Sequence, residues 1–258
     1  MIVLFFGDVV GRPARNLLLA RLPVLRHRYR ADAVIVNGEN AANGLGITPK
    51  VADTLFAGGV DVITTGNHVW RYKEIYAYLE ENSRIIRPFN YLPDNPGRGL
   101  TVVDVPGGRL GVLNLSGTLM LNPARSAFEV VDEALEHLHG VRNVIVDMHA
   151  EATSEKVALG FYLAGRVSAV LGTHTHVRTG DARILAGGTA YITDVGMCGS
   201  RDSVIGVNKE IILRRMLTQM PATFQVAEHD LWLEGVAVEL DESGRAVRIT
   251  PFEEASGE

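Results

Sequence analysis

Short runs of apolar, often β-branched residues recur along the chain, and each run ends in glycine or polar residues. The five clearest runs are Ile2 to Phe6, Ala33 to Val36, Val60 to Thr65, Val144 to Met148 and Ser168 to Leu171. Uninterrupted apolar runs of this length are typical of strands buried on both faces of a sheet. The pattern therefore predicts five buried strands of an α/β protein.

Segments with apolar residues at helical spacing separate these runs. The first has Pro13 at a favourable first helical position, followed by Leu18, Leu22 and Leu25 along one face. The predicted helices are Pro13 to Arg28, Thr48 to Ala57, Arg71 to Glu80, Phe128 to Leu138, Ser154 to Ala164 and Asn208 to Met216. Strands that alternate with helices in this way predict an α/β fold.

Three further stretches have the pattern of β-hairpins. They are Thr101 to Leu115, Ile184 to Ile192, and the pair Gly235 to Leu240 and Ala246 to Phe252, each with a glycine-containing turn. Antiparallel strands are thus expected beside the parallel ones, in two facing mixed sheets. Because no repeat or linker interrupts the pattern, we expect one domain over residues 1–258.

Composition restricts the classes of partner. The net charge is −5 and no long basic run occurs, so strong binding of duplex nucleic acid is not expected. Cys198, the only cysteine, excludes an intramolecular disulfide, and we expect it in a glycine-rich loop from Gly196 to Gly199. No stretch approaches the ~20 apolar residues of a membrane helix, which favours a cytoplasmic protein without a membrane partner. The apolar composition is compatible with a homo-oligomer.

Residue types that bind metal ions follow all five predicted strands. They are Asp8, Glu39, Asn40, Asn67, His68, His149, His174 and His176. Functional groups of open α/β sheets gather beyond the carboxyl ends of the strands, so these side chains are expected to converge. Carboxylates, imidazoles and amide oxygens without a thiolate suit manganese, iron or zinc.

Each of these residues also has an ordinary structural interpretation. Asp8 could cap a helix, Glu39 and Asn40 could form a turn, and His149 could be a hydrogen-bonded core histidine. The occurrence of ligand types at five strand ends favours a metal centre over five separate coincidences. The remaining histidines are expected at the surface: His27, His137, His139 and His229.

The order of these motifs resembles the calcineurin-like metallophosphoesterases. The matching segments are Gly7-Asp8, Gly38-Glu39, Gly66-Asn67-His68 and His174-Thr175-His176. Val10 stands where that superfamily has a second metal-binding histidine, and Glu39 replaces its bridging aspartate. With Gly38 to Ala42 and Asp202 to Gly206, these departures resemble the bacterial YmdB-like branch over the whole chain. The resemblance implies a four-layer α-β-β-α sandwich with two mixed β-sheets.

The resemblance also implies two divalent or mixed-valence metal ions, iron or manganese, with zinc as the alternative. The first ion would be held by Asp8, Glu39, Asn40 and His176, and the second by Glu39, Asn67, His149 and His174. A hydroxide between the ions would attack a small nucleotide phosphodiester, chiefly a 2′,3′-cyclic nucleotide. His68 is not needed as a ligand and is the candidate to stabilise or protonate the leaving oxygen.

Several alternatives stay open at this stage. The same centre would serve a phosphomonoesterase or an RNA nuclease, and a regulatory protein could sense a nucleotide there without turnover. No substrate-binding residue is identified. Ser116 to Ser126 could form a wall near the metals or an ordinary surface loop. Arg178 and Asp181 could contact substrate or orient ligands.

Overall fold

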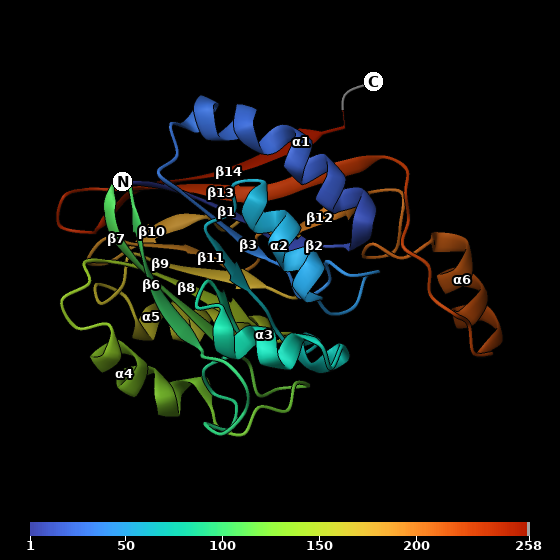
Figure 1. Ribbon diagram of the computed structural model, residues 1–258, viewed down its shortest axis with the longest axis horizontal. Helices are drawn as coiled ribbons and strands as arrows, with labels where there is room; N and C mark the ends of the chain where they lie inside the picture. The colour runs from blue at the N-terminus through green and yellow to red at the C-terminus, as the bar shows by residue number, and fades with distance from the viewer. Residues whose placement is uncertain (257–258) are drawn as a thin grey trace.

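Two mixed β-sheets lie face to face in the computed structural model, which describes residues 1–256, and helices cover both outer faces (Figure 1). In the first sheet the strand order is β2-β12-β13-β1-β3-β4-β5, with β14 paired to β13. Its strands are β1 (Ile2–Phe6), β2 (Asp8–Val9), β3 (Ala33–Asn37), β4 (Val62–Thr64), β5 (Ile85–Ile86), β12 (Met197–Ser200), β13 (Leu231–Leu240) and β14 (Ala246–Ala255). Neighbours are parallel from β1 to β5, whereas β13 is antiparallel to β1.

The second sheet has the strand order β10-β11-β9-β8-β7-β6. Its strands are β6 (Leu100–Val105), β7 (Gly108–Ser116), β8 (Asn143–His149), β9 (Ala169–Thr173), β10 (Arg183–Leu185) and β11 (Thr189–Ile192). The four central strands are parallel, and an antiparallel hairpin partner lies at each edge. The three predicted hairpins and the two mixed sheets are therefore confirmed.

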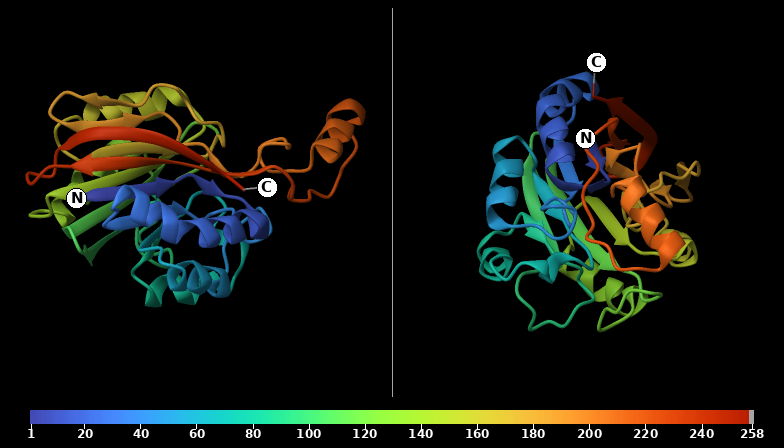
Figure 2. Two further views of the ribbon diagram at one scale, coloured as in Figure 1. Left: turned by 90° about the horizontal axis from the view of Figure 1, so that it is seen from above. Right: turned by 90° about the vertical axis from the view of Figure 1, so that its right-hand side faces the viewer.

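Helices form the two outer layers. The first sheet is covered by α1 (Gly11–Tyr29), α2 (Pro49–Ala57), the 3₁₀ helix η1 (Val69–Arg71) and α3 (Ile75–Glu81), and the second by α4 (Ala127–His137) and α5 (Thr153–Tyr162). The last helix, α6 (Lys209–Thr218), projects away from both sheets, as Figure 2 shows. The four-layer arrangement expected from the resemblance is confirmed.

Three apolar clusters separate the four layers. Phe5 and Val112 belong to the cluster between the sheets, which draws residues from both. Leu18 and Leu22 of α1 pack on the outer face of the first sheet, and Val131 of α4 on that of the second. Burial of one such aliphatic side chain stabilises the folded state by about 1.5–3 kcal/mol. The three clusters therefore hold the two sheets and the helices in fixed positions relative to one another.

Two local predictions were wrong. The helix expected from Arg71 to Glu80 begins only at Ile75, because short-range bonds from Gly66 onward form η1 and turn the chain first. The glycine-rich loop expected from Gly196 to Gly199 extends no further than Gly196, since Met197–Ser200 forms β12 and pairs with β2 and β13, which lie far away in sequence. Within residues 1–256, no helix combines the length and the apolar character required to cross a membrane.

Candidate metal centre

The carboxyl ends of β1, β3, β4, β8 and β9 meet at one edge between the sheets. Hydrogen bonds and ion pairs join all eight predicted site residues there, from Asp8 to His176. Asp8 lies in β2, Glu39 follows β3, Asn67 follows β4, and His149 is the last residue of β8. The predicted convergence of residues distant in sequence is therefore present in the structure.

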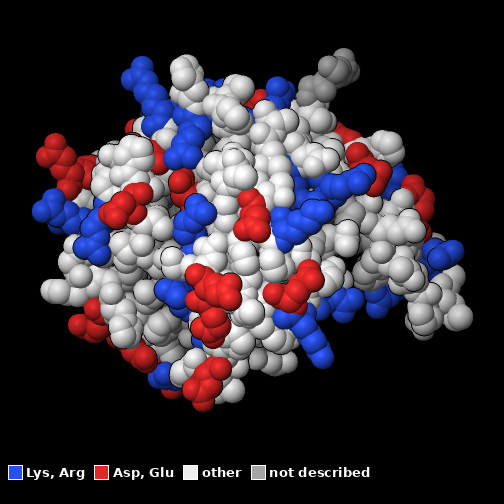
Figure 3. Space-filling view, in the orientation of Figure 1, with Lys and Arg blue, Asp and Glu red and all other residues white. Residues whose placement is uncertain are grey.

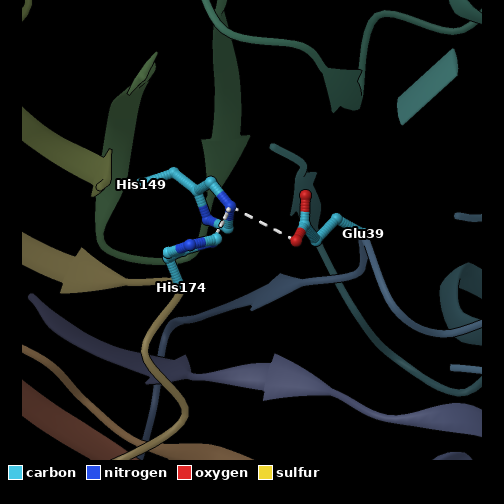
Figure 4. A group of neighbouring side chains, drawn as sticks. All are labelled: Glu39, His149 and His174. Carbon is cyan, nitrogen blue, oxygen red and sulfur yellow. Dashed lines mark hydrogen bonds and ion pairs between the residues drawn. The ribbon is translucent and has the colours of Figure 1, made fainter. Parts of the chain in front are cut away.

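One group of donor atoms surrounds the Nε2 atom of His149 (Figure 4). This atom lies 3.2 Å from Glu39 Oε1, 3.1 Å from His174 Nδ1 and 3.0 Å from Asn67 Oδ1. Ligands about 2.1 Å from one ion lie about 3.0 to 3.4 Å apart in octahedral or tetrahedral geometry. The group has the donor types and the spacing that a transition-metal ion requires.

A second group gathers around Asp8 and His176. The Nε2 atom of His176 lies 3.6 Å from Asp8 Oδ1 and 3.1 Å from the Asn40 amide nitrogen. That nitrogen also lies 3.4 Å from Asp8 Oδ1 and 3.3 Å from Glu39 Oε1. The positions fit four ligands of one ion, but the amide of Asn40 presents its nitrogen, which is not a ligand atom. Its oxygen accepts from His68 Nδ1 at 2.8 Å instead.

Glu39 belongs to both groups. Its carboxylate is buried, and Oε1 contacts the nitrogen atoms of His149 and His68 at 3.2 Å each. Its other oxygen accepts from the backbone N–H of His68 at 3.1 Å. Burial would raise the pKa of this carboxyl, but the His149 and His68 rings outweigh burial and hold the pKa well below its usual range. Glu39 is therefore an ionised group placed between two sets of nitrogen and oxygen donors.

The carboxylates of Glu39 and Asp8 change the pKa values of the histidines in the cluster. Burial alone would lower the pKa of His149, but Glu39 and Asp8 raise it to about 9. His176 behaves alike, because Asp8 overcomes burial and raises its pKa to about 9. Burial and the neighbouring His149 lower the pKa of His174 to about 4. The carboxylates thus attract positive charge, which either protons or bound cations can supply.

A buried chain of hydrogen bonds beneath His149 fixes its ring. Asp147 accepts from Thr173 Oγ1 at 2.7 Å and from Thr64 Oγ1 at 2.5 Å. Because the Thr173 hydroxyl donates its only proton to Asp147, it accepts from Nδ1 of His149, 2.9 Å away. The proton of a neutral His149 ring is therefore on Nδ1, and Nε2 faces the cluster with its lone pair.

Glu151 orients His174 in a similar way. Its carboxylate lies 3.1 Å from His174 Nε2, which leaves Nδ1 to face His149 and Glu39. Neither Asp147 nor Glu151 was anticipated from the sequence. Asp147 could have been found, because it is the one charged residue within the apolar run Val144 to Met148. Glu151 had no comparable signal, since an exposed carboxylate after a strand is common.

The loop that carries the paired histidines has an unusual backbone. His174 and His176 have φ angles of 98° and 63°, a region that residues other than glycine rarely adopt. Asp8 Oδ2 accepts from the backbone N–H of His174 at 2.9 Å. Asp194 Oδ2 accepts from the N–H and the hydroxyl of Thr175 at 3.2 and 2.8 Å. Buried carboxylates thus stabilise a conformation that the local sequence alone does not favour.

Other residues singled out from the sequence lie outside the cluster. Arg178 pairs with Glu253 at 3.0 Å, and Asp181 accepts from Thr179 and Thr193. Cys198 is buried in β12. The four histidines expected at the surface are exposed: His27, His137, His139 and His229.

Comparison with known proteins places the chain in a family. The model of the YmdB-like proteins matches residues 4–252. The 2′,3′-cyclic-nucleotide 2′-phosphodiesterase of Bacillus subtilis is 45% identical over 251 residues, which cover 96% of this chain and 95% of that protein.

Two crystal structures superpose over nearly the whole chain. A hypothetical protein from Thermus thermophilus has 44% identity and a TM-score of 0.92, with 99% of both chains covered. A structure described as a novel phosphatase from Mycoplasma pneumoniae has 36% identity and a TM-score of 0.92, covering 99% of this chain and 93% of that one. The family model matches residues 4–252, and the Bacillus subtilis protein is 45% identical over nearly the whole chain, so the protein belongs to the YmdB-like family.

Proposed function

We propose that this protein is a phosphodiesterase that uses two metal ions to hydrolyse cyclic nucleotides, chiefly 2′,3′-cyclic ones. The observation that carries the proposal is the position of Glu39 Oε1, which lies 3.2 Å from His149 Nε2 and 3.3 Å from the Asn40 amide. One carboxylate thus joins two sets of donors spaced for metal ions. The relative from Bacillus subtilis, named for hydrolysis of these substrates, supports the choice of substrate.

The donor groups suggest which residues would hold each ion. Glu39, Asn67, His149 and His174 already direct carboxylate or amide oxygen and ring nitrogen atoms to one point, and a bound ion would replace the proton on His149 Nε2. The other ion would be held by Asp8, Glu39, Asn40 and His176. This requires the terminal amide of Asn40 to rotate by about 180°, so that its oxygen replaces its nitrogen beside His176. Such a turn exchanges atoms of nearly equal size, so it needs no rearrangement of the backbone. After this rotation, the Asn40 amide nitrogen would donate a hydrogen bond to an unprotonated Nδ1 atom of His68.

Bound ions would activate water as a nucleophile and offset the charge that develops on the phosphate. The protein itself would supply the proton. The side chain of His68 is one-third exposed, and its contacts to Asn40 and Glu39 are made through Nδ1. The opposite edge of the ring is left to hold a proton at the leaving oxygen of the substrate.

Elemental analysis coupled to hydrolysis assays tests the proposal. We expect about two metal ions per chain and turnover of 2′,3′-cyclic AMP that is lost in Glu39→Gln. A nucleoside monophosphate and a short RNA serve as competing substrates, since their preferential hydrolysis would indicate a phosphomonoesterase or a nuclease. Metal-loaded protein that binds the cyclic nucleotide without hydrolysing it would favour the regulatory alternative.

Some expectations from the sequence stay predictions. These are the choice of iron or manganese over zinc, a single domain over residues 1–258, a place in the cytoplasm, self-association and the weak affinity for duplex nucleic acid. Basic and acidic side chains are interspersed on the face seen in Figure 3. A mixed surface of this kind offers duplex phosphates less attraction than a continuous basic patch would.

A further inference from the structure

A cavity of about 550 Å³ opens beside the metal cluster. Asn67 links the two, because its Oδ1 atom lies 3.0 Å from His149 Nε2 and the residue also lines the cavity. The volume is in the usual range for pockets that bind small molecules. A ligand that places a phosphate at the cluster could therefore extend its remaining atoms into this cavity.

One wall of the cavity is aromatic. Trp70 and Tyr91 both line it, with ring centroids 6.1 Å apart and planes inclined by 35°. Tyr76 packs edge-on against Trp70, with centroids 5.5 Å apart, and its hydroxyl donates to the Trp70 carbonyl. The Trp70 ring is thus held in place from behind, as a platform for stacking requires.

A loop of residues 117–124, here called the wall loop, supplies another part of the lining. Asn90 is fully buried and holds both flanks of this loop. Its side chain exchanges two hydrogen bonds of 2.8 Å with the backbone of Ser116 and donates to the Arg125 carbonyl at 2.9 Å. Glu155 accepts from the backbone N–H groups of Thr118 and Leu119. The wall loop is therefore anchored at its ends.

The chemistry of the cavity favours a neutral, flat ligand. Among the described residues that line it, none is charged. Leu92 and Met120 are 57% and 85% exposed at its mouth, and Asn95 and Asn122 supply amide groups. A nucleobase has an apolar face to stack and a polar edge for amides, whereas a second phosphate would require cationic partners.

We propose that this cavity is the nucleobase subsite of the enzyme, lined by Trp70, Tyr91 and the wall loop. The inference rests on the proposed phosphodiesterase function. In a 2′,3′-cyclic nucleotide the ribose separates the base from the phosphate, so a base site has to adjoin the metal cluster without entering it. The cavity beside Asn67 meets that condition.

Two substrates test the subsite. One is 2′,3′-cyclic AMP, and the other is methyl riboside 2′,3′-cyclic phosphate, which keeps the reacting group but lacks the base. We expect the wild-type protein to prefer the nucleotide about tenfold or more in kcat/KM. Trp70→Leu and Met120→Ala should reduce that ratio toward one. Met216→Ala, which changes another largely exposed methionine on the distant α6, should leave it unchanged.

A binding measurement provides a readout besides turnover. Trp70 and Trp232 are the only tryptophans, so Trp232→Phe isolates the fluorescence of Trp70. We expect 3′-adenosine monophosphate, but not ribose 3-phosphate, to change this fluorescence. Equal kcat/KM for both cyclic substrates, or an unchanged ratio in both cavity variants, would overturn the base subsite alone. Failure of metal-loaded protein to hydrolyse either substrate would overturn the phosphodiesterase function, and this inference with it.

Discussion

The ammonium group of Lys156 lies 2.7 Å from the Asp194 carboxylate, and neither side chain is accessible to solvent. The same Asp194 oxygen accepts two hydrogen bonds from Thr175, which stands between the paired histidines. Burial raises the pKa of Asp194, and the charge of Lys156 opposes this effect. The ion pair between Lys156 of α5 and Asp194, which follows β11, thus supports the loop that brings His174 and His176 to the metal centre.

Removing one member of this pair should destabilise both the fold and the loop. For Lys156→Met we expect the free energy of unfolding to fall by about 3 kcal/mol or more, because an uncompensated carboxylate stays buried. Metal content should fall as well. Lys156→Met combined with Asp194→Asn should recover much of the stability but not the metal affinity. Denaturant unfolding and elemental analysis measure the two effects, and equal stability of the single and double variants would contradict the explanation.

Replacing His68 should separate catalysis from metal binding. We expect His68→Ala to lower kcat by about 10²- to 10⁴-fold, the usual contribution of a positioned acid, with metal content close to that of the wild type. His137→Ala, which changes an exposed histidine of α4, is the matched control. Loss of bound metal in His68→Ala would instead show that this residue is a ligand or a structural element of the site.

The hydroxyl of Thr173 should determine how well His149 binds metal. Thr173→Val removes the acceptor 2.9 Å from His149 Nδ1, so the ring loses the bond that fixes its orientation and proton. We expect metal affinity to fall about 10- to 100-fold, while Thr173→Ser stays close to the wild type. Competition with a chromogenic chelator measures the affinity. Wild-type affinity in Thr173→Val would show that the Thr173 hydroxyl does not control metal binding by His149.

The backbone of Gly66 packs so closely against Glu39 and His149 that a side chain at this position should disrupt the metal site. A Cβ atom there would lie 2.3 Å from both Glu39 Oε2 and His149 Nε2, too close for any unshifted contact. We expect Gly66→Ala to lose bound metal while its circular dichroism stays near that of the wild type. Gly180→Ala is the control, because a Cβ at that position meets nothing within 4 Å. Full metal occupancy in Gly66→Ala would contradict this expectation, because it would mean that Glu39 and His149 can shift and still bind the metal.

Thermal stability should depend on pH in opposite directions with and without metal. Without metal, burial acts to lower the pKa values of His149 and His176. The carboxylates of Glu39 and Asp8 outweigh burial and raise both pKa values from 6.5 to about 9. Their stabilising contribution is full below pH 6.5 and is lost as the pH rises toward 9. Chelator-treated protein should therefore melt at lower temperature at pH 9 than at pH 6.5.

Metal-loaded protein should behave in the reverse way over the same range. Ions bind only unprotonated rings, so affinity, and with it the melting temperature, should rise with pH. Differential scanning calorimetry at matched ionic strength compares the two forms. Parallel pH profiles would show that the histidines of the cluster do not exchange protons for metal.

The sequence by itself determined the strands and the residue types at their ends. Short uninterrupted apolar runs such as Ile2 to Phe6, which end in glycine and polar residues, favour burial as strands within a sheet, and parallel strands place their carboxyl ends at a common edge. The convergence of Asp8, Glu39 and His149 could therefore be predicted without coordinates. Local pattern also sufficed for the hairpins, because their turns are set by neighbouring residues.

Tertiary structure alone decided how those side chains are held and what lies beside them. The support from Asp147 and Lys156 depends on strands and helices that meet only after folding. The orientation of the Asn40 amide and the cavity lined by Trp70 and the wall loop likewise depend on contacts between distant segments. Sequence periodicity reports which face of an element is buried, but it does not report which residue of another element it meets there.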